Sequence, residues 1–104
     1  MNPTQKKYRV VIHNKTEDML YAHIMFLSEV SVASARKLRD LCYDAFKLLE
    51  KIPHRFPVYK TSKTANEYRQ LIMEKRYHVI FSINENDVLV EIRYILDTQH
   101  HNVF

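Results

Sequence analysis

The last third of the chain, residues 68 to 104, contains three consecutive segments with the composition of β-strands. They read YRQLIM, RYHVIFSI and VLVEIRYIL, and the polar tail DTQHHNVF follows directly. Segments rich in β-branched and aromatic residues, separated by short turns, predict strands that follow one another as an antiparallel meander. The fold must therefore contain a small sheet, and we expect any functional chemistry to gather on one face of it.

The residues before the meander predict one strand and two helices. The segment YRVVIH at 8–13 is short and β-branched, as a strand is. Asn14 and Glu17 have the spacing of an N-terminal capping pair, which predicts a helix of about fifteen residues. Ser31 can cap a second helix, and Pro53 ends it because proline cannot continue the helical ladder. The predicted fold class is α+β in the order β-α-α-β-β-β, a helical hairpin packed on a small antiparallel sheet.

Length and composition limit the class of protein. A chain of 104 residues predicts a single domain, residues 1–104. Its one cysteine, Cys42, excludes an internal disulfide and falls in the helical apolar pattern as a small buried residue. The opening MNPTQKKYRVVIHNK lacks the apolar core of a signal peptide, and no run reaches the ~18 apolar residues of a membrane span. We expect a soluble cytoplasmic protein that does not enter the membrane.

The chain contains no glycine. We therefore expect left-handed backbone positions at asparagines such as Asn84 and Asn86, whereas Glu74 and Lys75 would make a poor two-residue hairpin turn. Without glycine there is no phosphate-binding glycine loop, which excludes P-loop and dinucleotide-binding functions. Metal-ligand spacings such as CxxC or HExxH do not occur either, and we expect no metal and no cofactor.

Positive charge is concentrated in the middle of the chain. Residues 51–76 hold seven Lys and Arg side chains and two Glu, an excess larger than the net charge of +4 for the whole chain. The polar segment 53–67 within this region is the longest predicted loop, and long loops often carry function. Clustered positive charge attracts phosphate backbones or acidic proteins.

The order of these elements and the text of the strands resemble the RelE/ParE superfamily of toxins from bacterial type II toxin–antitoxin systems. The best-matching parts are YRVVIHNKTEDML, LLEKIPHRFP and EYRQLIMEKRYHVIFSINENDVLVEIRYILDTQHH, which together cover nearly the whole chain. The resemblance implies a RelE/ParE-like fold and a toxin that inhibits growth, with plasmid stabilisation as a biological role. It also implies a cognate acidic antitoxin as partner, and a homodimer in the absence of that antitoxin.

The family divides by target, and three functions follow from the resemblance. ParE-like members inhibit DNA gyrase by protein binding, and the two long predicted helices favour this branch. RelE-like members are metal-independent endoribonucleases that cut mRNA on the ribosome. An inert or weakly toxic binding module of the same fold is the third reading. Whether the chain is an enzyme therefore stays open.

If the chain is a ribonuclease, the resemblance gives the catalytic role to four residues. His78 stands where most members carry an arginine, and Arg76, two residues earlier, is expected to point to the same face. His100 and His101 follow the last strand, where some members carry histidine or tyrosine. The contacts to nucleic acid or another target are expected from the basic residues Lys60, Lys63, Arg69, Lys75 and Arg93.

Purely structural roles for the same residues remain open. His78 fits equally a structural place on its strand, and His100 and His101 fit a frayed polar tail. Gln99 replaces a basic residue that is usual in the ParE-like branch, as His78 does in the ribonuclease branch. Along the last strand, alternation places Arg93 on the polar face and Tyr94 on the opposite face, in the core.

Overall fold

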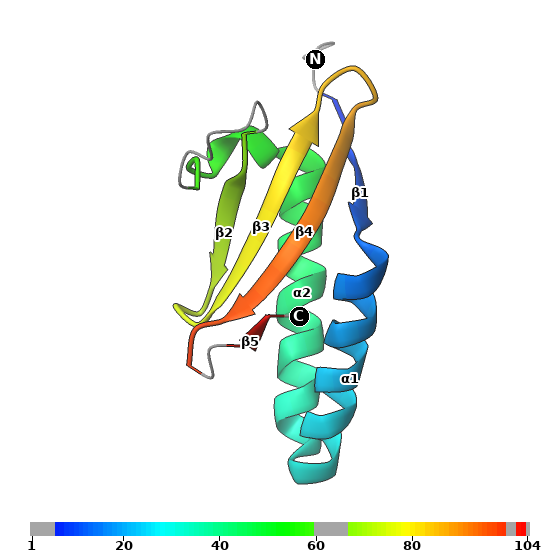
Figure 1. The fold of residues 1–104 in the computed structure, drawn as a ribbon, viewed down its shortest axis with the longest axis vertical. Helices are drawn as coiled ribbons and strands as arrows, with labels where there is room; N and C mark the ends of the chain where they lie inside the picture. Colours follow the sequence, from blue (N-terminus) through cyan, green and yellow to red (C-terminus); the bar gives the residue numbers. More distant parts are fainter. Residues whose placement is uncertain (1–5, 60–66, 100–101, 104) are drawn as a thin grey trace.

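The computed structural model describes residues 6–59, 67–99 and 102–103 of the chain (Figure 1). Its elements follow the predicted order β-α-α-β-β-β, with a short 3-10 helix and a two-residue strand added. They are β1 (Arg9–Ile12), α1 (Asn14–Val30), α2 (Val32–Lys51), η1 (Pro53–Arg55), β2 (Arg69–Met73), β3 (Tyr77–Asn84), β4 (Leu89–Asp97) and β5 (Asn102–Val103). The α+β class is confirmed.

The sheet is mixed, whereas an antiparallel sheet was predicted. Its strand order is β1-β4-β3-β2, and β5 pairs with the end of β4. The pairs β2–β3 and β3–β4 are antiparallel, but β1 lies parallel to β4. The helical hairpin explains this direction. It returns the chain to the end of the sheet where β1 began, so β2 and β4 run the same way as β1, while β3 and β5 run in the opposite direction (Figure 1).

Helix α2 forms the core with one face of the sheet. Its buried positions recur at helical spacing: Ala35, Leu38, Cys42, Ala45 and Leu49. They belong to one cluster with buried side chains of the sheet, among them Leu71, Val79, Phe81, Val90, Ile92 and Ile95. Full burial of a side chain such as Leu49 contributes about 1.5–3 kcal/mol. The predicted cap is confirmed, because the side chain of Ser31 accepts a hydrogen bond from the backbone N–H of Ser34 at 3.2 Å.

Helix α1 begins differently from the prediction. Its N-cap is His13, which makes no side-chain cap bond, and Asn14 is already the first helical residue. The cause is the short connection from β1. The backbone N–H of His13 still bonds to the sheet at the carbonyl of Ile92, while its own carbonyl accepts the first helical bond from Glu17. One residue therefore ends the strand and starts the helix, and the proposed cap of Asn14 with Glu17 is wrong.

In the described turns, asparagine does not occupy the left-handed positions. Among the described residues, positive φ occurs at Glu74 (50°), Lys75 (58°) and Val88 (50°). Glu74 and Lys75 form the turn between β2 and β3, which the hydrogen bond from the N–H of Arg76 to the carbonyl of Met73 closes at 3.0 Å. Two successive positive φ angles are what a primed hairpin turn requires, so the hairpin twist overrides residue preference here.

The helical hairpin extends well past the end of the sheet (Figure 1). In α1 only Thr16 and Leu20 are buried. The hairpin leaves large apolar side chains exposed, among them Tyr21, Met25, Phe26, Val30 and Val32. Within the described residues, neither helix combines the length and the apolar character that crossing a bilayer requires.

Candidate functional site

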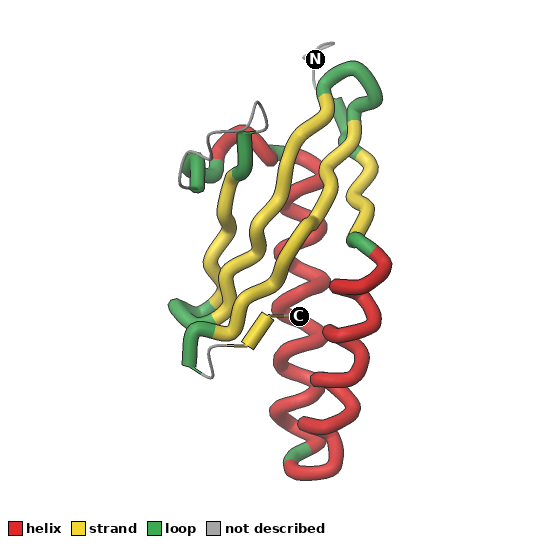
Figure 2. The backbone as a smooth tube through the Cα atoms, in the orientation of Figure 1, coloured by secondary structure: helices red, strands yellow, loops and turns green. Residues whose placement is uncertain are grey.

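The face of the sheet opposite the helices is open, and it is the surface on which the sequence predicted a site (Figure 2). Alternation along β3 directs Val79 and Phe81 into the core, so His78, Ile80 and Ser82 lie on the open face. A bulge shifts the register of β4, because Ile80 lies opposite Tyr94 while Phe81 lies opposite Ile92. Strict alternation therefore fails at this point of β4.

The bulge corrects the prediction for Tyr94. Its side chain was expected in the core, but the residue is 53% exposed and pairs with Ile80 on the open face. Arg93 is the extra residue of the bulge, and its guanidinium lies 3.7 Å from the carboxylate of Glu91. Arg93 therefore keeps the polar surroundings that the sequence indicated, and Tyr94 joins it at the surface instead of facing away.

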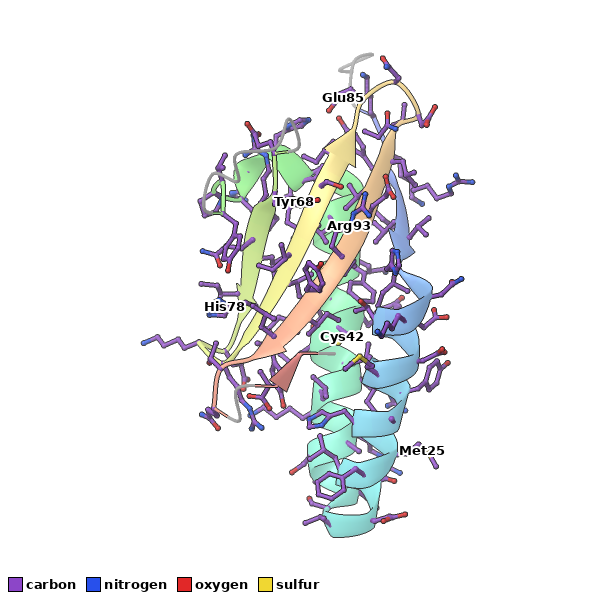
Figure 3. All side chains as sticks on the ribbon, viewed as in Figure 1. Met25, Cys42, Tyr68, His78, Glu85 and Arg93 are labelled. Atoms are coloured by element: carbon purple, nitrogen blue, oxygen red, sulfur yellow. The ribbon has the colours of Figure 1, made fainter. Side chains whose placement is uncertain are left out.

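A cavity of about 570 Å³ lies at the end of the open face nearest the β3–β4 turn. Its wall carries three basic side chains and three carboxylates: His54, Arg69, Arg93, Glu67, Glu85 and Glu91. Figure 3 shows Arg93 on the open face and Glu85 at the tip of the turn. Because the two signs of charge are balanced, this cavity is not a uniformly positive surface for a phosphate backbone.

The two described members of the predicted catalytic set do not lie together. Arg76 precedes the first residue of β3, and its Nε and Nη2 donate to the carboxylate of Asp97 at 3.0 and 2.9 Å. Asp97 pairs with Tyr77, whose side chain is buried in the core cluster, whereas His78 lies on the other face. The expectation that Arg76 and His78 share a face is therefore not met, because the turn residue Arg76 does not follow strand alternation.

His78 has apolar neighbours across the sheet. Its partners are Ile72 on β2 and Leu96 on β4, and it is half-buried between them. Figure 3 places His78 near the β2–β3 end of the sheet, opposite the end that carries Glu85. Among the described residues, the His78 side chain forms no hydrogen bond and no ion pair.

The other basic residues that were predicted as target contacts differ in their surroundings. Arg69 is held within the protein, since its guanidinium donates to the carbonyls of His54 and Phe56 at 3.2 and 2.7 Å and to Glu67 at 3.1 Å. Lys75 is exposed in the β2–β3 turn. Four predicted residues lie outside the described residues: Lys60, Lys63, His100 and His101.

A cluster around Glu85 was missed in the sequence. Its carboxylate accepts hydrogen bonds from the Tyr8 hydroxyl at 2.9 and 3.1 Å, contacts His54 Nε2, and lies 3.4 Å from Lys6 Nζ. Burial and the bond to Glu85 raise the pKa of Tyr8, while the bonds from Tyr8 and His54 lower the pKa of Glu85. No local motif signals this cluster, because its members come from the residues just before β1, from η1 and from the β3–β4 turn.

Comparisons of the chain with models of protein families, with curated proteins and with solved structures found no match. A functional assignment for this chain therefore rests on its own sequence and geometry.

Proposed function

We propose that this chain is a toxin of the RelE/ParE type that inhibits growth by binding a protein target, and that the target is DNA gyrase. The observation that carries the proposal is the projecting hairpin with its exposed apolar side chains. Tyr21, Met25, Phe26 and Val30 are each at least 60% exposed on α1. Isolated exposed apolar residues are ordinary, but several on one projecting element mark a protein-binding surface.

The geometry of the hairpin suits insertion against another protein. Tyr21 and Met25 are four residues apart on α1, so they lie on neighbouring turns of one helix face. Met25 points away from the body of the protein (Figure 3). Aromatic and methionine side chains dominate the centres of protein interfaces because they bury a large area per residue.

The places of Arg76, His78 and Arg69, which were predicted to act on RNA, favour protein binding over RNA cleavage. Metal-independent cleavage of RNA needs a base near the 2′-hydroxyl and free cations around the scissile phosphate. Arg76 is bonded to Asp97 and Arg69 to two backbone carbonyls, while His78 lies between Ile72 and Leu96. Ribosome-dependent mRNA cleavage is therefore the alternative function, and the expression experiment below distinguishes it from gyrase inhibition.

An acidic antitoxin is the proposed partner, as the resemblance implies. A cavity of about 350 Å³ between the two helices has a mainly apolar wall, and Leu20, Ile24 and Phe46 contribute to it beside Arg39. The outer edge of β1 adjoins the same region, with Val11 exposed. An acidic segment that folds on binding can place apolar side chains in this groove or add a strand to β1. A toxin of this kind acts in the cytoplasm.

The test is controlled expression in a bacterial host with two readouts. Inhibition of gyrase predicts SOS induction and filamentation, whereas a ribonuclease predicts immediate translation arrest with cut mRNA. The double variant Met25→Asp with Phe26→Asp should abolish the SOS response, because it places two charges on the proposed binding surface at positions that are exposed in the free protein. The matched control His78→Ala should retain it.

Three results contradict the proposal. mRNA cleavage that His78→Ala abolishes would assign the protein to the ribonuclease branch. Normal growth at a high level of folded protein would leave an inert binding module. An SOS response that persists in the double aspartate variant would show that the hairpin surface does not bind the target.

A further inference from the structure

A second cavity, of about 380 Å³, lies at the end of α2 and shares His54 with the cavity on the open face. Basic side chains from two separate parts of the chain line it. Lys51, His54 and Arg55 come from the end of α2 and from η1, and Lys6 precedes β1. Among the described residues no carboxylate lines this cavity, in contrast to the balanced charge of the first one.

Two of these cations are not neutralised within the described part of the protein. Lys6 lies 3.4 Å from Glu85, and His54 contacts the same carboxylate. Lys51 and Arg55 are both exposed, and neither forms an ion pair among the described residues. A cation in the last turn of a helix compensates the helix dipole, which accounts for Lys51. It does not account for a cavity that Lys6 also lines.

The cluster around Glu85 fixes the wall of this cavity. Tyr8 is buried, and its hydroxyl donates to Glu85 Oε1 at 2.9 Å and lies 3.4 Å from His54 Nε2. Glu85 lines the other cavity and not this one, and its charge is matched by donors from Tyr8, His54 and Lys6. The carboxylate therefore positions two basic groups without facing into the hollow.

We propose that this cavity is a binding site for the phosphate groups of a small soluble ligand, such as a nucleoside diphosphate. Arg55 offers the planar fork that binds phosphate in a bidentate manner, and Lys51 offers a point charge beside it. Two cations that form no ion pair among the described residues suit a ligand that carries at least two negative charges. The volume lies within the range of sites for small molecules, about 300–1,000 Å³. The site is independent of the proposed action on gyrase.

The experiment is calorimetric titration of the full chain with pyrophosphate. Wild type should bind one pyrophosphate per chain. The double variant Lys51→Ala with Arg55→Ala should bind at least about tenfold more weakly, because a hydrogen bond to a charged group contributes about 1.5–3 kcal/mol. The matched control is Arg36→Ala with Lys47→Ala, which removes the same charge from exposed positions of α2 that do not line the cavity. Circular dichroism checks that every variant keeps its helices.

The outcomes separate a site from a general charge effect. An unchanged affinity in the control supports the site. Equal losses in the control and the test variant would overturn it, and so would the absence of saturable binding to wild type. A single-stranded oligonucleotide serves as a second titrant. If it binds while pyrophosphate does not, the surface recognises a nucleic-acid backbone, and the small-ligand proposal is wrong.

Discussion

The contact between Arg76 and Asp97 yields the sharpest prediction for stability. The Asp97 side chain is fully buried, while the Arg76 side chain is 27% exposed, and two hydrogen bonds of 3.0 and 2.9 Å join them. Arg76 also lies over the ring of Tyr77, 4.8 Å from its centroid. The Arg76→Ala substitution would remove the guanidinium that donates both of these hydrogen bonds to a buried carboxylate.

The magnitude follows from the burial of the pair. Breaking a buried ion pair on one side costs about 3–5 kcal/mol. The partial exposure of Arg76 and a bond from the N–H of Gln99 to Asp97, at 3.1 Å, place this pair at the lower end. We therefore expect Arg76→Ala to lower the free energy of unfolding by about 3 kcal/mol. Arg76→Lys keeps the charge but loses the bidentate geometry, so about 1–2 kcal/mol is expected.

The assay is urea unfolding followed by circular dichroism. With a slope of about 1–3 kcal/mol per molar urea, Arg76→Ala should lower the midpoint by roughly 1–3 M. Lys75→Ala is the matched control, since it removes a neighbouring exposed cation and should change stability by less than about 0.5 kcal/mol. If Arg76→Ala unfolds at the wild-type midpoint, the structural role is refuted. A residue whose role is only to bind phosphate would show that result, with activity lost and stability kept.

Three further predictions concern single side chains. Burial raises the pKa of the Cys42 thiol to about 11, so at pH 8 Cys42 should react with a thiol reagent only on unfolding, and rapid reaction of native protein would contradict its burial. Lys75→Gly should raise the unfolding free energy by about 1 kcal/mol because glycine accepts the left-handed backbone without strain, and a midpoint equal to that of Lys75→Ala would contradict this reason. Glu85 has a pKa below its usual 4.5, so the stability it adds is present above pH 4.5 and is lost as the pH falls through its folded pKa. The difference in urea midpoint between wild type and Glu85→Gln should therefore be largest near neutral pH and shrink in acid, and a difference independent of pH would contradict the linkage.

The elements themselves were largely predictable from the sequence. Helix α2 was the clearest case, because Leu38, Cys42 and Leu49 keep helical spacing between a serine cap and a proline stop. The three strands of the meander were also predicted, from their short apolar segments, and β-branched and aromatic residues are most frequent in β3 and β4. The spacing of apolar residues indicates which side chains are buried. Because each of these elements buries one face, that spacing was enough to predict them.

The errors occur where one element constrains the next. Asn14 is a residue type that can cap a helix. However, the N–H of His13 still bonds to the sheet at Ile92 while its carbonyl accepts the first helical bond, so His13 becomes the N-cap. Tyr94 follows a bulge that alternation cannot foresee. Glu74 and Lys75 adopt left-handed angles because the twist of the hairpin demands them. Each of these features depends on the geometry of a neighbour and not on the residue's own preference.

The candidate sites were less predictable than the fold. Tyr8 and Glu85 are 77 positions apart, and only the parallel pairing of β1 with β4 brings them together. Arg69 was expected as a target contact and Arg76 as a catalytic residue, yet both bind acceptors inside the protein. Charge in a sequence indicates attraction to anions, but it does not say whether that anion is a ligand or a carboxylate of the same chain.

A gyrase supercoiling assay with purified protein is the most direct test of whether this hairpin binds gyrase. Wild type and His78→Ala should inhibit supercoiling to the same extent, and Met25→Asp with Phe26→Asp should not inhibit it. The same preparations should leave ribosome-bound mRNA intact. Full supercoiling in the presence of excess folded wild-type protein, or inhibition that survives both aspartates, would contradict the proposal that this hairpin binds gyrase.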